Sequence, residues 1–187
     1  MLFAGLGNPG EKYKNTRHNI GREILKIWAE KSNMSALTDF ELNPKFNALI
    51  SKNKRAVLIL PETMMNKSGQ AVGPATKFFK IKPKDIVILH DDADIEFGRT
   101  KLSFNRSAGG HKGIESVKRA LATEKFWRLR IGIQKKKRVD AMKLVLQKFT
   151  PAEETILKKL KKKITAGLDL IIEEGPERAM NEINARR

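Results

Sequence analysis

Short apolar runs alternate with amphipathic stretches along the chain. Residues 2–6 (LFAGL) and 86–89 (IVIL) are nearly uninterrupted apolar runs, which is typical of strands covered on both faces, and His90 extends the second run. Between these runs, apolar residues recur at i, i+4, i+7 and i+8 over positions 20–28. That spacing predicts an amphipathic helix, and Asn19 stands where a helix cap is expected.

The same periodicities predict the remaining elements. Further strands are expected at residues 46–51, 55–60, 99–104 and 128–133. Helices are expected after a Ser68 cap, from about residue 113 to 122, and twice after Val139.

Alternation of strands and helices indicates an α/β fold. We expect residues 1–187 to form one domain, a three-layer sandwich in which helices flank a mixed, partly parallel central sheet. The last dozen residues are expected to fray.

The stretch GLGNPG at residues 5–10 matches the G-x-G-x-x-G pattern of dinucleotide-binding turns. Such a turn opens directly into a helix, and an acidic residue ends a second strand about 20 residues later. Here the polar stretch EKYKNTRHN follows, and Glu30 falls within the predicted helix. The context therefore excludes a dinucleotide site, and the glycines indicate a backbone open to close approach.

Charge and composition narrow the possible partners. The chain has 38 Lys and Arg against 21 Asp and Glu, a net charge of +17. Such an excess favours RNA or DNA over a membrane surface, although a generally basic surface is the alternative explanation. The chain has no cysteine, which excludes disulfides, thiolate zinc sites and a cysteine nucleophile. Neither a cleaved leader nor a membrane-spanning segment is expected, because Met1 leads straight into a strand and every apolar run is short.

Five ordered motifs narrow the function. They read GLGNPG..Y..TRHN.G, P.T.MN.SG, HD..D...G, SAGGH.G and F.RLRIGI, and they span residues 5–133. In these motifs the chain resembles the bacterial-type peptidyl-tRNA hydrolase family. The resemblance implies hydrolysis of the ester that joins a peptide to the terminal adenosine of tRNA, with no cofactor and no metal.

The resemblance places the catalytic roles on His18 and Asp91. An ester hydrolase without a nucleophile or metal can use a general base to activate water, and a carboxylate on the second imidazole nitrogen fixes the tautomer. We expect Asp92 and Asp94 to be loop structure, because the spacing of a calcium loop is absent. Ser68 lacks the surroundings of a nucleophile elbow, so it is better explained as a helix cap.

The resemblance also implies the substrate contacts. Asn8 and, with more weight, Asn66 are expected to line the site as amide donors. Tyr13 is expected to pack on the terminal nucleotide or the peptide, with core packing as the alternative, and His111 to form part of the wall, with structural packing as the alternative. The family usually has asparagine where this chain has Lys112, which offers donors only and is suited to a phosphate or an oxyanion.

Basic residues beside the cleft are the expected tRNA phosphate contacts. Lys101 and Arg106 precede the GGH motif, and strand alternation puts Arg128 and Arg130 on one face. The resemblance implies a contact with the 5′-phosphate at this face, for which we favour Arg130. Ser103 stands where related chains often have a basic residue.

Two functional hypotheses follow. The first is a peptidyl-tRNA hydrolase, expected to be cytoplasmic and monomeric, with tRNA as its partner and no membrane or obligate protein partner. The second is a tRNA- or RNA-binding protein on the same scaffold whose hydrolysis is weakened or lost through Lys112. Retention of His18, Asp91 and Asn66 favours the enzyme.

Overall fold

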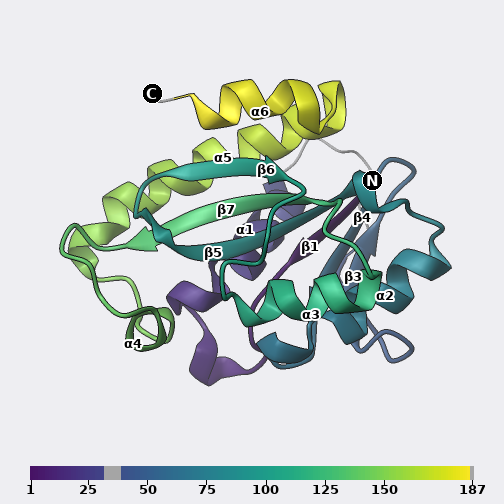
Figure 1. The fold of residues 1–187 in the computed structure, drawn as a ribbon, viewed down its shortest axis with the longest axis horizontal. Coiled ribbons are helices and arrows are strands. Elements are labelled where there is room, and N and C mark those ends of the chain that lie inside the picture. Colours follow the sequence, from purple (N-terminus) through teal and green to yellow (C-terminus); the bar gives the residue numbers. More distant parts are fainter. Residues whose placement is uncertain (32–38, 186–187) are drawn as a thin grey trace.

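A seven-stranded sheet runs through the molecule in the order β2-β3-β4-β1-β5-β7-β6 (Figure 1). The central strands β4, β1, β5 and β7 are parallel, and the outer strands β2, β3 and β6 are antiparallel to their neighbours. The computed structural model describes residues 1–31 and 39–185. The strands are β1 Leu2–Gly5, β2 Glu41–Asn43, β3 Ala48–Lys52, β4 Val57–Pro61, β5 Ile86–Glu96, β6 Thr100–Phe104 and β7 Trp127–Gln134.

Helices cover both faces of this sheet. Helices α1, α5 and α6 pack on one face, and α2 and α3 pack on the other. The three-layer α/β architecture expected from the sequence is therefore confirmed. Within the described ranges, no helix has the length and apolar character needed to cross a membrane. The helices are α1 Ile20–Lys31, α2 Gly69–Phe78, α3 Lys112–Leu121, α4 Ala141–Val145, α5 Glu154–Glu174 and α6 Pro176–Asn184.

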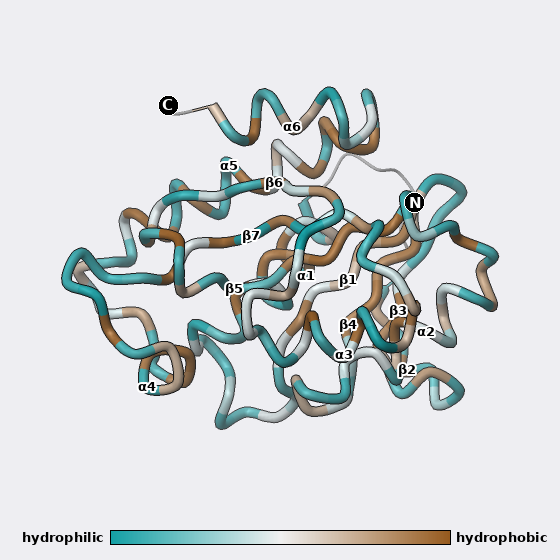
Figure 2. The backbone as a smooth tube through the Cα atoms, viewed as in Figure 1, coloured by the Kyte–Doolittle hydropathy of each residue, from teal (hydrophilic) through white to brown (hydrophobic). Residues whose placement is uncertain are grey.

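Alternation along each central strand builds two cores, one on each face of the sheet. In β1, Phe3 faces the α1 side and its ring lies 5.0 Å from that of Trp28, whereas Ala4 faces the α2 side. All four residues of β1 are buried, which explains why this strand reads as an uninterrupted apolar run. The hydropathy colouring in Figure 2 shows the same arrangement, with apolar strands at the centre and polar segments outside.

Strand β5 is longer than its apolar run predicts. The acidic segment DDAD, in which Asp92 and Asp94 were expected to be loop, lies within β5. Main-chain pairing with β7 continues past the apolar part, with Asp92 opposite Gly132 and Glu96 opposite Gln134. The loop prediction is wrong because backbone pairing, rather than side-chain burial, carries the strand to Glu96.

The two predicted helix caps bind elsewhere. The Ser68 hydroxyl donates to the Met65 carbonyl at 2.8 Å and makes no capping hydrogen bond to α2. The Asn19 side chain bonds the main chain of Asn8 instead of the amides of α1. Tertiary partners have therefore replaced the local ones that residue type alone suggests.

A helix near the end of the chain lies against the sheet edge. Pro176–Asn184 form this helix, α6, which accounts for most of the described part of the last dozen residues. At its last turn, the Asn184 amide accepts from Leu102 N–H at 2.7 Å and donates to the Leu102 carbonyl at 3.0 Å. A side chain thus replaces a neighbouring strand at the open edge of β6.

Asn184→Ala should destabilise the protein by about 1–3 kcal/mol, because the main-chain groups of Leu102 lose both partners. Urea unfolding monitored by tryptophan fluorescence measures this change. Asn181→Ala, on an exposed position of the same helix, is the matched control and should stay within about 0.5 kcal/mol of wild type. Equal effects of the two substitutions would contradict a role of Asn184 in closing the edge.

Candidate active site

The 3₁₀ turn Arg17–Asn19 lies directly before α1 and carries His18, the predicted catalytic base. Because such a turn has about three residues per turn, successive side chains point roughly 120° apart. Arg17 reaches Glu153, His18 reaches Asp91, and Asn19 reaches the main chain of Asn8. The turn therefore connects three parts of the molecule and presents only His18 to the site.

Glycines allow this turn to approach the sheet closely. A Cβ on Gly21 would lie 2.3 Å from the Leu89 carbonyl oxygen, and one on Gly5 would lie 2.7 Å from the Gly21 oxygen. A Cβ on Gly7 would lie 3.0 Å from the Asn19 side chain. The glycine motif thus serves the close packing of α1 against β1 and β5.

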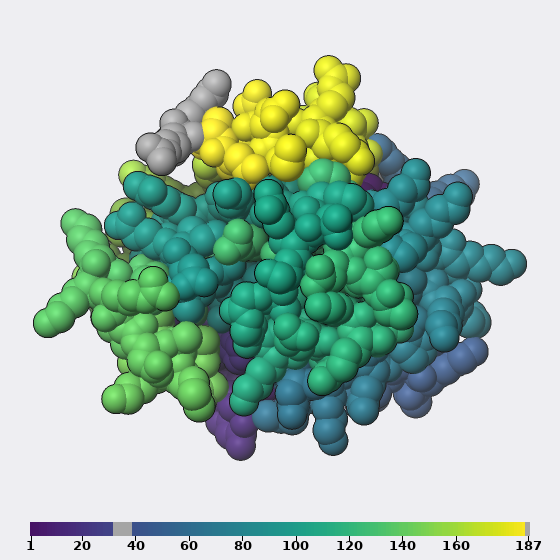
Figure 3. Space-filling view, in the orientation of Figure 1, coloured from purple at the N-terminus to yellow at the C-terminus, as the bar shows by residue number. Residues whose placement is uncertain are grey.

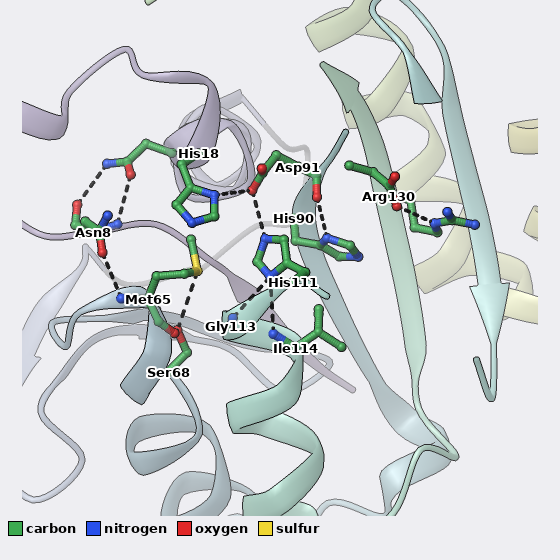
Figure 4. A network of polar contacts seen from close by, with 12 residues as sticks. Asn8, His18, Met65, Ser68, His90, Asp91, His111, Gly113, Ile114 and Arg130 are labelled. Carbon is green, nitrogen blue, oxygen red and sulfur yellow. Dashed lines mark hydrogen bonds and ion pairs between the residues drawn. The ribbon is translucent and has the colours of Figure 1, made fainter. Parts of the chain in front are cut away.

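Asp91 is the acceptor shared by two imidazoles. Its Oδ1 lies 2.8 Å from His18 Nδ1 and 2.9 Å from His111 Nε2 (Figure 4). The carboxyl is almost fully buried, and burial alone would raise its pKa. Attraction and hydrogen bonds from His111 and His18 outweigh burial and hold the pKa of Asp91 well below its ordinary value. The carboxylate is therefore ionised at neutral pH.

The tautomer of His111 is fixed by α3. Its Nδ1 caps the helix by accepting from the amides of Gly113 and Ile114, at 3.2 and 3.3 Å. The proton of the neutral ring must then reside on Nε2, which donates to Asp91. His18 likewise donates from Nδ1 to Asp91, which leaves its Nε2 as the unprotonated nitrogen.

All three histidines of the chain gather here. His90 is buried, its Nδ1 donates to the Asp91 carbonyl at 2.6 Å, and its ring lies edge-on to that of His111 at 4.7 Å. Burial, followed by the proximity of His111, lowers the pKa of His90 well below its ordinary value. Sequence analysis placed this residue in the strand and gave it no role; its position directly before Asp91 was the available signal.

The cluster of His18, Asp91 and His111 has the composition of a metal site, with ligand atoms within 4.8 Å of one another. The protonation pattern fits hydrogen bonds better than metal ligation. His111 Nδ1 is occupied by two helix amides, so Nε2 could bind a metal only by losing its proton or giving up the cap.

Asn8 is orientated by its neighbours. Its Oδ1 accepts from the Met65 amide at 2.8 Å, and its main chain makes two bonds with Asn19. The side-chain oxygen is therefore engaged, and the Nδ2 group is the donor that Asn8 can offer. Such a donor suits a carbonyl or an oxyanion.

His18 and Asp91 open onto a cavity of about 1100 Å³. Figure 3 shows the hollow between the green segment that carries α4 and the teal-green segment that leads into α3. The cavity brings together eight of the predicted site residues, namely His18, Asp91, Lys101, Arg106, His111, Lys112, Arg128 and Arg130. One hollow thus contains the hydrogen-bonded pair of His18 and Asp91 together with the expected phosphate contacts.

The two strand arginines have different environments. Arg130, which we favoured from the sequence, donates from Nε to Asp92 at 2.6 Å, so a carboxylate offsets its charge. Arg128 is buried opposite Ser103, and its Nε has no partner among the described residues. Burial, and then the charge of Arg130, lowers the pKa of Arg128. Arg128 is therefore the less compensated cation of the two.

Asn8, Tyr13 and Asn66 are not among the residues that line this cavity. Asn66 is exposed and lines a separate hollow between α2 and α3, and Lys12 lies 4.8 Å from the centre of the Tyr13 ring. Sequence analysis missed the exposed apolar residues of the α4 region, Met142 and Leu146, which do line the cavity. Helical periodicity gave no signal for them, because α4 has only five residues.

Comparison with known proteins agrees with this geometry. The family model described as peptidyl-tRNA hydrolase matches residues 2–187. The chain belongs to the peptidyl-tRNA hydrolase family. It is 37% identical to the peptidyl-tRNA hydrolase of Mycobacterium tuberculosis strain H37Rv over 190 residues, covering 99% of this chain and 97% of that one. The corresponding protein of Desulfitobacterium hafniense strain Y51 is 39% identical over 188 residues, covering 98% of each chain.

A solved structure of the same family gives the same fold. The peptidyl-tRNA hydrolase of Acinetobacter baumannii superposes with a TM-score of 0.88 at 33% identity, covering 100% of this chain and 95% of that chain. The peptidyl-tRNA hydrolase fold therefore extends over the whole chain, including the region after residue 135, where the sequence motifs end.

His90 should make stability depend on pH. The folded state keeps this ring neutral, whereas the unfolded chain takes up a proton below its ordinary pKa of 6.5. The contribution of His90 to the free energy of unfolding is therefore complete above pH 6.5. It is lost as the pH falls below 6.5, by up to about 1.4 kcal/mol per pH unit. Urea unfolding of wild type and His90→Asn at about pH 7.5 and about pH 5.5 measures this effect. The difference in unfolding free energy between the two proteins should be smaller at the lower pH. A constant difference would contradict a neutral buried ring.

Proposed function

We propose that His18 is the general base that activates water to cleave the ester between peptide and tRNA. The observation that carries this proposal is the 2.8 Å bond from His18 Nδ1 to the ionised Asp91, at the wall of a cavity that basic side chains also line. That bond leaves Nε2 as the basic nitrogen, which is the proton acceptor that the reaction requires.

The reaction proceeds in two steps. His18 Nε2 takes a proton from a water molecule as its oxygen attacks the ester carbonyl carbon, and the Asp91 carboxylate stabilises the imidazolium that forms. The carbon–oxygen bond to the ribose then breaks, and the imidazolium returns its proton to the departing ribose oxygen. The products are a peptide carboxylic acid, which ionises in water, and a tRNA with a free terminal hydroxyl.

Asn8 is our candidate for stabilising the developing oxyanion. Met65 engages its Oδ1, so Nδ2 is the group of this amide that would donate to a substrate. Loss of one such donor in other enzymes costs about 2.7–4 kcal/mol. Asn66 and Tyr13 remain our candidates for contacts with the peptide or the terminal nucleotide, and His111 acts by holding Asp91.

The tRNA contacts are proposed for the cationic side of the cavity. Lys101, Arg106 and Arg128 are the phosphate contacts that the local charges favour, with Arg130 paired to Asp92 beside them. Lys112 is exposed on the same wall and adds a cation next to His111. Such contacts are strongly salt-dependent, because each bound phosphate releases counterions.

Hydrolysis of peptidyl-tRNA is the activity indicated by the family, by the named relatives and by the solved structures. None of these comparisons favours the alternative of an RNA-binding protein without hydrolysis. We further propose that the chain acts as a monomer without a cofactor, in the cytoplasm, where tRNA is used and recycled.

His18→Ala should lower kcat for an N-acetylated aminoacyl-tRNA by about 10²–10⁴-fold, because the variant lacks the proton acceptor. Release of the acetylated amino acid measures the rate, and filter binding measures tRNA affinity, which should stay within about two-fold because His18 makes no phosphate contact. Wild-type protein that binds tRNA tightly but releases no amino acid would support the RNA-binding alternative.

Lys112→Asn should weaken tRNA binding and reduce the slope of log K against log salt by about 0.7–0.9, which corresponds to one phosphate contact. We expect kcat to stay within about three-fold of wild type, because the ammonium is not needed for proton transfer. Titrations at several salt concentrations measure the slope. An unchanged slope would mean that this lysine does not hold RNA. A rise in kcat of more than about ten-fold would mean that it hinders the reaction.

A further inference from the structure

Arg17, the residue directly before the proposed base, is fully buried. Its Nη2 donates to both carboxylate oxygens of Glu153, at 2.8 and 2.7 Å, and its Nη1 donates to the Ile133 carbonyl at 3.3 Å. Two rings lie beside the guanidinium, Phe149 with its centre at 4.6 Å and Phe97 at 5.8 Å. The two terminal nitrogens of the guanidinium are therefore held by specific contacts, whereas its buried Nε has no partner among the described residues.

A buried ion pair is a poor way to gain stability, because desolvation of both charges offsets their attraction. It is an effective way to fix geometry, since a planar guanidinium whose Nη2 bonds a carboxylate and whose Nη1 bonds a carbonyl has a single orientation. The pairing also holds Glu153 ionised: burial opposes this, but hydrogen bonds from Arg17 and Thr150 lower the pKa of the carboxyl. The ion pair of Arg17 and Glu153 is therefore a rigid contact directly next to His18.

The His18 side chain depends on its backbone for its place. Its ring has one hydrogen bond, to Asp91, and a ring contact with His111 at 5.1 Å. On one side, the 3₁₀ turn is anchored by Asn19, which bonds Asn8. On the other side, the anchor is Arg17, whose side chain holds Glu153 and whose amide donates to the Gln147 carbonyl at 2.9 Å.

We propose that Arg17 is a positioning residue for His18. Its ion pair with Glu153 holds the 3₁₀ turn so that His18 Nδ1 stays on Asp91 and Nε2 faces the substrate. The anchor also joins the turn to the segment after α4, which begins with the cavity-lining Leu146. This inference rests on the proposed catalytic role of His18, and Arg17 itself touches no substrate.

Arg17→Met tests the proposal, because it keeps the apolar contacts of the side chain and removes the guanidinium with its hydrogen bonds to Glu153 and Ile133. We expect kcat for N-acetylated aminoacyl-tRNA to fall by about 10–100-fold, since a misplacement of about 1 Å can cost about 10²-fold. KM should stay within about two-fold. Arg17→Lys should fall between Arg17→Met and wild type, because an ammonium cannot bridge both oxygens and the Ile133 carbonyl together.

Asp169→Ala is the matched control for lost stability. Asp169 accepts from Trp28 Nε1 at 2.7 Å and joins α5 to α1, away from the 3₁₀ turn. This variant should lower Tm and leave kcat unchanged. If Arg17→Met and Asp169→Ala lower Tm and kcat equally, Arg17 is merely structural and the proposal fails.

A second measurement is independent of catalysis. The proton on His18 Nδ1, assigned in NMR spectra by its loss in His18→Ala, should shift and broaden in Arg17→Met and keep its wild-type position in Asp169→Ala. An unshifted resonance together with wild-type kcat would overturn the proposal. Because this readout needs no substrate, it separates failure of Arg17 as a positioning residue from failure of the hydrolase mechanism.

Glu153→Ala approaches the same anchor from its other end. It should lower kcat as Arg17→Met does. The double variant should be no slower than either single variant, because each substitution removes the same contact between Arg17 and Glu153. Multiplying losses in the double variant would contradict a shared anchor. If Arg17→Met does not fold, Glu153→Gln, which keeps the side-chain shape, provides the same measurements of kcat and of the His18 resonance.

Discussion

One carboxylate oxygen, Oδ1 of Asp91, receives N–H bonds from two imidazoles, and the site is organised around that shared acceptor. It joins three elements distant in sequence, namely the turn before α1, strand β5 and the first turn of α3. A neutral acid at this position would accept less strongly from both rings, because a hydrogen bond to a charged acceptor is stronger than one to a neutral acceptor. The ionised state therefore strengthens the structure of the site as well as its chemistry, and the surplus of positive charge in the chain favours it.

The surrounding fold serves to bring these elements within hydrogen-bonding distance. Gly21 lets α1 lie against the Leu89 carbonyl, and the second ring nitrogen of His111 accepts from the amides of α3. The His111 proton that faces Asp91 is thus assigned by α3, and the His18 proton is assigned by Asp91 itself. The tautomer of His18 is therefore set by the fold before any substrate binds, as in a preorganised site.

Much of the fold could be predicted because parallel strands buried on both faces read as continuous apolar runs, as β1 does. Sequence patterns did not predict the polar half of β5, whose pairing is made by the backbone, or the exposed edge strand β2. The pairing of His18 with Asp91 came from the resemblance to a family and not from spacing, since 73 positions separate them. The link between Arg17 and Glu153 spans 136 positions, so no local pattern could reveal it.

The contact between α6 and β6 has a consequence for how the protein can be handled. With Asn184 in place, the outermost strand offers neither a free donor nor a free acceptor at Leu102. A chain cut before this helix would expose a bare strand margin, which can recruit the margin of another molecule and begin aggregation. An affinity tag at the carboxyl end should therefore leave α6 and its two bonds to Leu102 intact.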